Sequence, residues 1–191
     1  MIQYIVLLGA VAQLFGIAFY IKDMIKGKVK PNRITWLMWT IAPLIGAAAA
    51  FSSGVTWAVI PVFMAGFGPL LVLVASFLNK KAYWQLKSSD YLCGFFSFLA
   101  LLLWLITKEP VVAIVFAIIS DGLAAVPTLI KSWHHPETES AILYFIYLLG
   151  TSTGFLAIKS WVFPEYGFLV YLIAVQCLII FAIIRPRPVL K

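Results

Sequence analysis

Hydrophobic residues recur along this chain in seven long runs, and short segments rich in lysine, proline and glycine separate them. Each run comes close to the roughly 20 residues that a helix needs to cross about 30 Å of hydrocarbon. The pattern therefore predicts an all-α membrane protein with seven transmembrane helices and its termini on opposite sides. The predicted spans are Ile2–Ile21, Ile34–Phe51, Val55–Leu78, Tyr91–Ile106, Pro110–Ile130, Ala141–Ile158 and Gly167–Ile184.

Composition supports a chain solvated by lipid. Of the 191 residues, 63% are hydrophobic and 11% are charged, whereas a soluble domain carries roughly 25% charged residues. The first span begins Met-Ile-Gln-Tyr with no basic segment before it, and no cleavage site follows, so we expect a retained span and not a signal peptide. Cys93 and Cys177 both fall inside predicted spans and read as small hydrophobic residues.

The basic residues are distributed unevenly between the connections. Successive connections between the predicted spans lie on alternate sides of the membrane, and we call the side with the first connection the first set and the other side the second set. Of the 14 lysines and arginines, only Lys108 and Lys159 fall in the second set. The positive-inside rule then predicts an external N-terminus and a cytoplasmic C-terminus. The net charge of +7 is thus a topology signal, compatible with contact to anionic lipid, and we expect no nucleic-acid partner. The basic residues of the first set are Lys22, Lys26, Lys28, Lys30, Arg33, Lys80, Lys81, Lys87, Lys131, Arg185, Arg187 and Lys191.

An internal repeat relates the two halves of the chain. The segment Ala12–Gly46 aligns with Asp121–Gly154 at an offset of 108 or 109 residues. Aromatic residues coincide in this alignment, with Trp36 on Tyr144 and Trp39 on Tyr147, and so do the ends of the first and fifth predicted helices.

The repeat predicts a domain organisation. Residues 1–79 form one three-helix repeat, 80–107 a cytoplasmic loop and a linker helix, and 108–191 a second three-helix repeat with a cytoplasmic tail. A single linker crossing gives both repeats the same orientation, which makes them parallel repeats. Transporters of that design bind their substrate near the bilayer midplane, between the halves.

Asp121 is the acidic residue nearest the predicted midplane. It lies about eleven residues into its predicted helix, and at roughly 1.5 Å per residue that depth is the bilayer centre. A charge there costs roughly 2.5–3.5 kcal/mol on insertion scales, so it marks a pathway or a binding site by default. The carboxyl group could carry a proton or pair with a cationic substrate. The alternative is a structural acid, neutral or hydrogen-bonded to Gln13, that fixes helix packing.

Further polar residues share this depth and are candidate substrate contacts. Alternatives are open for them: serine and threonine hydroxyls often bond to their own helix backbone, and glutamines can bond across helices. These residues are Gln13, Thr151, Ser152, Thr153 and Gln176.

Prolines inside predicted spans are candidate hinges. Each removes a backbone hydrogen bond and kinks its helix. Gly66 and Gly68 precede Pro69, so the third helix is expected to bend or break there. A static packing role is the alternative. The candidate hinges are Pro43, Pro69 and Pro127.

The pairs Trp36/Trp39 and Tyr144/Tyr147 lie in the first turns of the second and sixth predicted helices. Rings at that level are often interfacial anchors, and the alternative is a cytoplasmic gate or the wall of a cavity.

Known catalytic and metal-binding patterns do not match this sequence. A phosphate loop, a nucleophile elbow and a His-Glu-x-x-His pattern are all missing, so we expect no enzyme activity, no catalytic residues, no metal and no cofactor. The adjacent His134 and His135 lie with Glu137 and Glu139 in a connection that we expect to be solvated. A light-driven opsin needs a lysine midway along its last helix, and Gly167–Ile184 has none.

The segment Val126-Pro127-Thr128-Leu129-Ile130-Lys131-Ser132-Trp133, followed by Glu137-Thr138-Glu139-Ser140 and a new helix, resembles a PQ-loop, although Thr128 stands where that motif has glutamine. The three-plus-one-plus-three layout with an external N-terminus also resembles the PQ-loop/SWEET-like superfamily. That superfamily includes sugar, cystine, cationic amino-acid and nicotinamide riboside transporters. SWEET sugar sites use asparagines in the third and seventh helices, and this chain has none there, so the resemblance does not imply a sugar.

The pattern and the resemblance together predict a transporter of a small polar solute that works by alternating access, with or without proton coupling. Its partners would be that solute and the lipid bilayer of a prokaryotic inner membrane, and both a monomer and a homodimer are compatible. The alternatives are a non-transporting receptor or adaptor of the same fold, and a membrane scaffold. The predicted substrate-binding residues are Asp121, Gln13, Thr151, Ser152, Thr153, Trp39, Tyr147 and Gln176.

Overall fold

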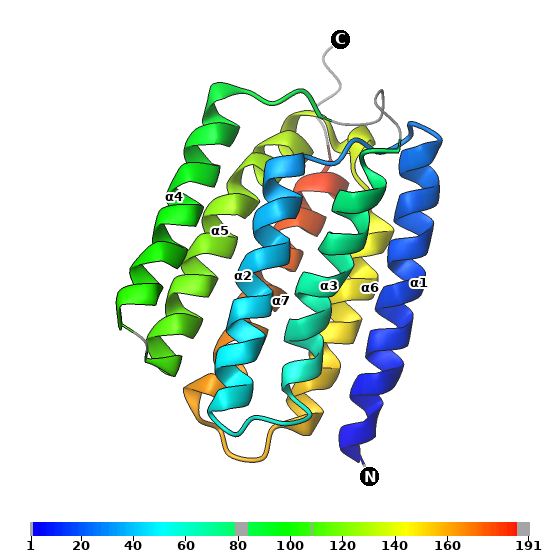
Figure 1. Cartoon of the computed structure of the whole chain (residues 1–191). Helices are drawn as coiled ribbons and strands as arrows, with labels where there is room; N and C mark the ends of the chain where they lie inside the picture. The colour runs from blue at the N-terminus through cyan, green and yellow to red at the C-terminus, as the bar shows by residue number, and fades with distance from the viewer. Residues whose placement is uncertain (1, 79–83, 108, 187–191) are drawn as a thin grey trace.

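The structure, a computed structural model, describes residues 2–78, 84–107 and 109–186 and forms a bundle of helices (Figure 1). No β-strand occurs in these three ranges. Short 3₁₀ helices lie at Ile2–Tyr4, Pro136–Thr138 and Thr153–Ala157. The α-helices are α1 (Ile5–Ile25), α2 (Arg33–Ser52), α3 (Val59–Ala75), α4 (Ser88–Thr107), α5 (Pro110–His134), α6 (Ala141–Ser152) and α7 (Phe163–Ile184).

Five segments are long and apolar enough to cross a membrane: Ile2–Ile25, Arg33–Ser52, Val59–Ser76, Pro110–His134 and Phe163–Ile184. Large apolar side chains cover the outside of the bundle, among them Leu8, Phe15 and Phe181, which are 71%, 63% and 57% exposed. An apolar exterior of this kind suits lipid and not water. The chain is therefore an integral, multi-pass membrane protein.

Side-chain caps begin two of the helices. Asn32 Oδ1 accepts hydrogen bonds from the backbone amides of Ile34 (3.1 Å) and Thr35 (3.3 Å) at the start of α2. Ser140 Oγ accepts one from the amide of Leu143 (3.4 Å) at the start of α6. These oxygens satisfy amides that have no partner within the helix.

Several predicted helix ends differ from the observed ones: α1 and α5 continue four residues further, to Ile25 and His134, and α7 begins four residues earlier, at Phe163. The third helix begins at Val59 and not at Val55. The sixth predicted span ends as an α-helix at Ser152 and continues as a 3₁₀ helix, because Ser152 and Thr153 hydroxyls bond to the carbonyls of Leu148 (2.7 Å) and Gly150 (2.6 Å). Hydroxyls that compete for the backbone in this way weaken the regular α-helical pattern.

The helices pack against one another throughout the bundle. The helix α3 contacts both α1 and α2, and α7 contacts both α5 and α6. In addition, α1 packs on α6 and α2 packs on α5. The helix α4 packs mainly on α5, at the edge of the bundle in Figure 1.

One end of the bundle holds most of the described basic residues, and we call it the basic end. The connection between α1 and α2, the end of α5 and the end of α7 meet there, while the N-terminus and the α2–α3 and α6–α7 connections lie at the opposite end (Figure 1). Its basic residues are Lys22, Lys26, Lys28, Lys30, Arg33, Lys87, Lys131 and Arg185.

The core is aromatic toward the basic end and built from small residues toward the opposite end. The aromatic cluster includes Tyr20, Trp36 and Trp39, and the other cluster includes Ala47, Ala117 and Phe168. Gly46 shows how close the packing is there, because a Cβ at this position would lie 2.5 Å from the ring of Phe168. Small residues allow membrane helices to approach each other closely.

The third helix was predicted to bend or break near Pro69; it does not break, and the bend stays a prediction. The helix α3 runs without interruption through Gly66, Gly68 and Pro69, and α2 and α5 likewise continue through Pro43 and Pro127. Neighbouring helices hold these turns in place, as is usual for prolines in membrane helices.

Candidate functional site

A small cavity lies inside the bundle and draws its walls from five helices. Its volume is about 50 Å³, and a water molecule needs roughly 10–15 Å³ on the same measure, so the cavity holds roughly three to five waters. All of the lining residues are buried. They are Trp36 and Trp39 from α2, Ala65 and Pro69 from α3, Asp121 from α5, Leu143, Tyr144 and Tyr147 from α6, and Leu172, Val175, Gln176 and Ile179 from α7.

Four aromatic side chains make up much of the wall. The rings of Trp36 and Trp39 lie 5.6 Å apart at an angle of 73°, and those of Trp39 and Tyr144 lie 6.4 Å apart at 78°. Such edge-to-face contacts turn the faces of neighbouring rings in different directions, as in a box. With Tyr147 they are buried within the protein, which favours the cavity-wall interpretation over interfacial anchors.

Asp121 is the charged residue of this wall. It is 2% exposed, and its Oδ2 accepts a hydrogen bond of 2.7 Å from the hydroxyl of Tyr171. Its backbone carbonyl accepts one of 3.2 Å from Trp39 Nε1. Its Oδ1 has no hydrogen-bond partner within the described ranges, and no ion pair to the carboxylate is found there. The hydrogen bond to Gln13 that formed part of the structural alternative is not present, and Tyr171 is the donor to the carboxyl group.

Gln176 presents a second polar group to the cavity. Its Nε2 donates to Thr151 Oγ1 at 3.2 Å, while its Oε1 lacks a partner in the part of the chain that the structure describes. The same holds for Trp36 Nε1. Buried polar atoms are normally hydrogen-bonded, so unpartnered ones on residues that line a cavity are candidate contacts for a ligand or water.

Gln13 lies behind the wall. Its Nε2 donates to the backbone carbonyl of Tyr147 at 3.4 Å, and its side chain packs against Gly150 so closely that a Cβ there would lie 2.7 Å away. Gln13 therefore joins α1 to α6 and supports Tyr147. Tyr147 in turn donates to the carbonyl of Met64 at 3.5 Å and packs against Gly68 of α3.

The structure thus brings together some of the predicted site residues and not others. Asp121, Trp39, Tyr147, Gln176 and Pro69 line the cavity. Thr151 and Gln13 contact that wall from behind through the hydrogen bonds described above. The remaining predicted residues, Ser152, Thr153, Pro43 and Pro127, do not line it.

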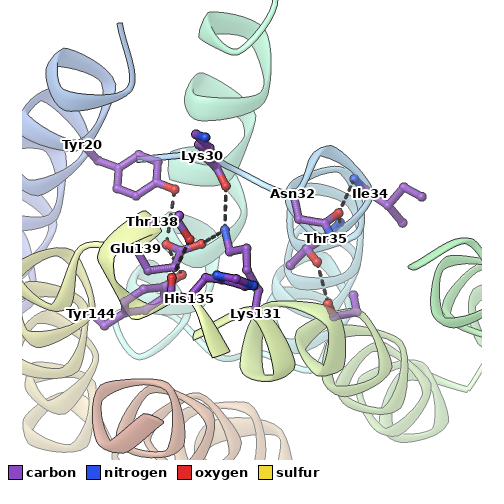
Figure 2. A network of polar contacts seen from close by, with 11 residues as sticks. Tyr20, Lys30, Asn32, Ile34, Thr35, Lys131, His135, Thr138, Glu139 and Tyr144 are labelled. Atoms are coloured by element: carbon purple, nitrogen blue, oxygen red, sulfur yellow. Dashed lines mark hydrogen bonds and ion pairs between the residues drawn. The ribbon is translucent and has the colours of Figure 1, made fainter. Parts of the chain in front are cut away.

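A buried polar network closes the basic end next to the cavity (Figure 2). Lys131 of α5 forms an ion pair with Glu139, and their side chains are 1% and 0% exposed. Lys131 Nζ also donates to the backbone carbonyl of Lys30 at 2.6 Å. Glu139 Oε2 accepts hydrogen bonds from the hydroxyls of Tyr20 (3.4 Å) and Tyr144 (3.3 Å). The network therefore joins α1, the α1–α2 connection, α5 and α6.

This network corrects one prediction. The connection with His134, His135, Glu137 and Glu139 was expected to be solvated, and both histidines and Glu137 are indeed exposed. Glu139 is buried, because Lys131 supplies a charge of opposite sign and two tyrosines supply hydrogen bonds.

Tyr144 belongs to both the network and the cavity wall, so the network forms the basic-end boundary of the cavity. Leu172 lines the cavity on the other side and packs into the small-residue cluster with Phe168 and Leu169. The cavity is thus bounded by polar contacts toward one end and by apolar contacts toward the other.

Comparison with known proteins adds no relative to this picture. No family model, no curated protein and no solved structure matches this chain. The function has to be argued from the cavity and from the helices around it.

Proposed function

We propose that this protein is a membrane transporter that moves a small polar solute by alternating access through the central cavity. The observation that carries this proposal is a cavity in a membrane protein whose lining residues, from α2 and α3 on one side and α5, α6 and α7 on the other, include Asp121 and Gln176 with unpartnered polar atoms. We treat α1–α3 and α5–α7 as two groups of helices. A buried polar site in the membrane is costly and is usually functional. We further propose that all seven α-helices cross the bilayer.

The packing of the helices supports a pair of parallel repeats. Both groups have the same spatial order, with the third helix between the first and second, so that α3 and α7 correspond. If α1–α3 is placed on α5–α7 and the reverse, the contact between α1 and α6 becomes the contact between α5 and α2. This order is what a two-fold axis along the membrane normal would produce, as in transporters with parallel repeats.

Residue positions support the same symmetry. The helix caps Asn32 and Ser140 stand 108 residues apart in the chain, as do the wall residues Trp36 and Tyr144. In this arrangement the chain resembles the PQ-loop/SWEET-like superfamily, and the cavity occupies the place where a substrate would bind.

The structure corresponds to an occluded state in this proposal. The cavity of about 50 Å³ is too small for a sugar or an amino acid, and the Lys131–Glu139 ion pair and the small-residue cluster pack near its two ends. Opening the basic end requires the network around Lys131 and Glu139 to separate. The net stability of a buried ion pair is small, because water solvates both charges once they separate. The network can therefore open at modest cost in free energy.

The prolines contribute to opening in this proposal. Pro69 lies at the cavity itself. Pro127 lies about one turn after Ala124 and nearly two turns after Asp121, and the carbonyls of these two residues accept hydrogen bonds from Thr35 and Trp39 of α2. Because proline removes a backbone hydrogen bond, the helix bends there at low cost. By the positive-inside rule, the basic end faces the cytoplasm.

A cysteine at Val175 tests the proposal. Val175 lines the cavity, so Val175→Cys, with Cys93 and Cys177 changed to serine, places one thiol inside it. In liposomes with oriented protein, a thiol reagent that cannot cross membranes should label this cysteine when added to either side. The expected labelling from each side follows from alternate opening of the two ends.

The control is Leu178→Cys in the same background, because Leu178 is on the same helix and 55% exposed on the outside. A lipid-facing thiol should resist the reagent from both sides. Labelling of Val175→Cys from one side alone would favour a receptor that binds a ligand in an open cavity. Labelling from neither side would favour a scaffold, and either result contradicts transport.

A further inference from the structure

The unpartnered polar atoms of the residues that line the cavity are mainly acceptors. Asp121 Oδ1 and Gln176 Oε1 have no partner within the described ranges, whereas Trp36 Nε1 is a donor without one. The polar hydrogens of the other lining aromatic residues are in use: Trp39 donates to Asp121, Tyr144 to Glu139 and Tyr147 to Met64. A ligand that satisfies this wall must therefore bring hydrogen-bond donors of its own.

The wall also contains an acidic residue and no basic one. Asp121 is the acid among the lining residues, and no lysine, arginine or histidine is among them. The buried lysine nearest in the chain, Lys131, is held by Glu139 and by the carbonyl of Lys30. A carboxylate buried in a bilayer is costly without a cation, so a positively charged ligand would be stabilised here.

The aromatic rings favour the same charge. Trp36, Trp39, Tyr144 and Tyr147 surround the cavity from α2 and α6. Tryptophan and tyrosine faces attract cations, and boxes of such rings are used to bind ammonium groups. Two independent features, the carboxylate and the rings, thus select a cation.

The absence of a basic residue from this wall limits the ligand further. A carboxylate or phosphate on the ligand would lie near Asp121 with no cation to offset the repulsion. Amino acids and phosphate esters are therefore disfavoured. A neutral sugar could donate hydrogen bonds but would leave Asp121 uncompensated.

We propose that the cavity binds a small primary ammonium ion without an acidic group, with its N–H groups on Asp121 Oδ1 and Gln176 Oε1 and its positive charge against the aromatic box. This inference rests on the proposed transport function and names its substrate class. The volume of about 50 Å³ suits a ligand of a few non-hydrogen atoms in the occluded state.

Thermal unfolding of the purified full chain in lipid nanodiscs tests this inference. The probes are propylammonium, 1-propanol and tetramethylammonium. Propylammonium and 1-propanol have the same number of non-hydrogen atoms but differ in charge, and tetramethylammonium is charged but has no N–H. A ligand that binds the native state raises the melting temperature, and at equal concentration the ligand with the lower Kd raises it more. We expect propylammonium to raise it most, tetramethylammonium less and 1-propanol not at all.

Two matched variants locate the effect. Asp121→Asn should weaken propylammonium binding by about 10- to 100-fold, because it removes the charge from the principal acceptor. Asp90→Asn makes the same change at a buried acid of α4 outside the cavity and should leave binding unaltered. If Asp121→Asn does not fold, the comparison of propylammonium with 1-propanol on the unaltered protein still decides the charge preference.

Equal effects of propylammonium and 1-propanol, or equal binding by Asp121→Asn and the unaltered protein, would overturn the ammonium site. If tetramethylammonium raises the melting temperature as much as propylammonium does, the ligand needs no N–H group and the assignment of a primary ammonium ion is overturned. The labelling of Val175→Cys separates this inference from transport. If Val175→Cys is labelled from both sides but propylammonium is not preferred over 1-propanol, the substrate class alone is overturned. If propylammonium is preferred but Val175→Cys is labelled from one side, transport alone is overturned.

Discussion

The side chain of Asp121 depends on Tyr171. The tyrosine hydroxyl is the hydrogen-bond donor to Oδ2 at 2.7 Å, and it leaves Oδ1 open to the cavity ligand in our proposal. Without this donor both carboxylate oxygens would lack a partner in a buried position. Tyr171 is therefore a positioning residue for the carboxylate.

Tyr171→Phe tests that role. A hydrogen bond to a charged group contributes about 1.5–3 kcal/mol, and one between neutral groups about 0.5–1.5 kcal/mol. The substitution should destabilise the unaltered protein by the larger amount and the Asp121→Asn protein by the smaller one. Denaturation of the four proteins in detergent gives the coupling between the two residues. Equal costs in both backgrounds would show that Tyr171 stabilises the fold without acting on Asp121.

For single residues, the sequence predicts how far along its helix a residue lies but not which side of the helix it faces. The depth of Asp121, Gln176, Trp39 and Tyr147 within their apolar runs was enough to select them, and all four line the cavity. Thr151 and Gln13 share that depth and lie behind the wall. Tyr171 was not selected because nothing in the spacing of residues fifty positions apart indicates that the two side chains meet.

Between elements, the ion pair of Lys131 and Glu139 is the contact that holds α5, α6 and the α1–α2 connection together at the basic end. Its two side chains are buried, and Tyr20 adds α1 through its hydroxyl. Breaking a buried pair by removing one partner costs about 3–5 kcal/mol, because the other charge is left uncompensated.

Glu139→Gln should therefore lower the stability of the protein in detergent by about 3–5 kcal/mol and increase labelling of Val175→Cys from the basic side. The double variant Lys131→Met/Glu139→Leu should recover most of the stability, since replacement of a buried pair by apolar residues is often neutral. A double variant as unstable as Glu139→Gln would mean that the tyrosine hydrogen bonds, and not the charges, hold this end closed.

The sequence predicted the elements better than their contacts. All seven apolar runs contain an α-helix, since length and hydropathy alone determine where a chain can cross a bilayer. The end of α6 was misjudged because consecutive hydroxyl side chains bond to their own backbone. Glu139 was placed in solvent because its partner, Lys131, lies in the preceding helix and a loop sequence gives no sign of burial.

For the whole molecule, our proposal treats α1–α3 and α5–α7 as two units that rock against each other. The cavity lies between them, with the ion-pair network toward one end and apolar packing toward the other. In this proposal the bundle has discrete states, because packed interfaces are bistable and do not deform continuously. Alternating access then requires that one end closes when the other opens.

Distances between spin labels at the two ends measure this motion most directly. One pair, Lys26→Cys with His134→Cys, spans the basic end, and the other, Thr56→Cys with Lys159→Cys, spans the opposite end; all four positions are exposed. Both pairs are made with Cys93 and Cys177 changed to serine, in the unaltered protein and in Glu139→Gln. Our account predicts that Glu139→Gln lengthens the basic-end distance and leaves the opposite-end distance short. If each pair of labels gives one distance, and that distance is the same in the unaltered protein and in Glu139→Gln, alternating access is contradicted.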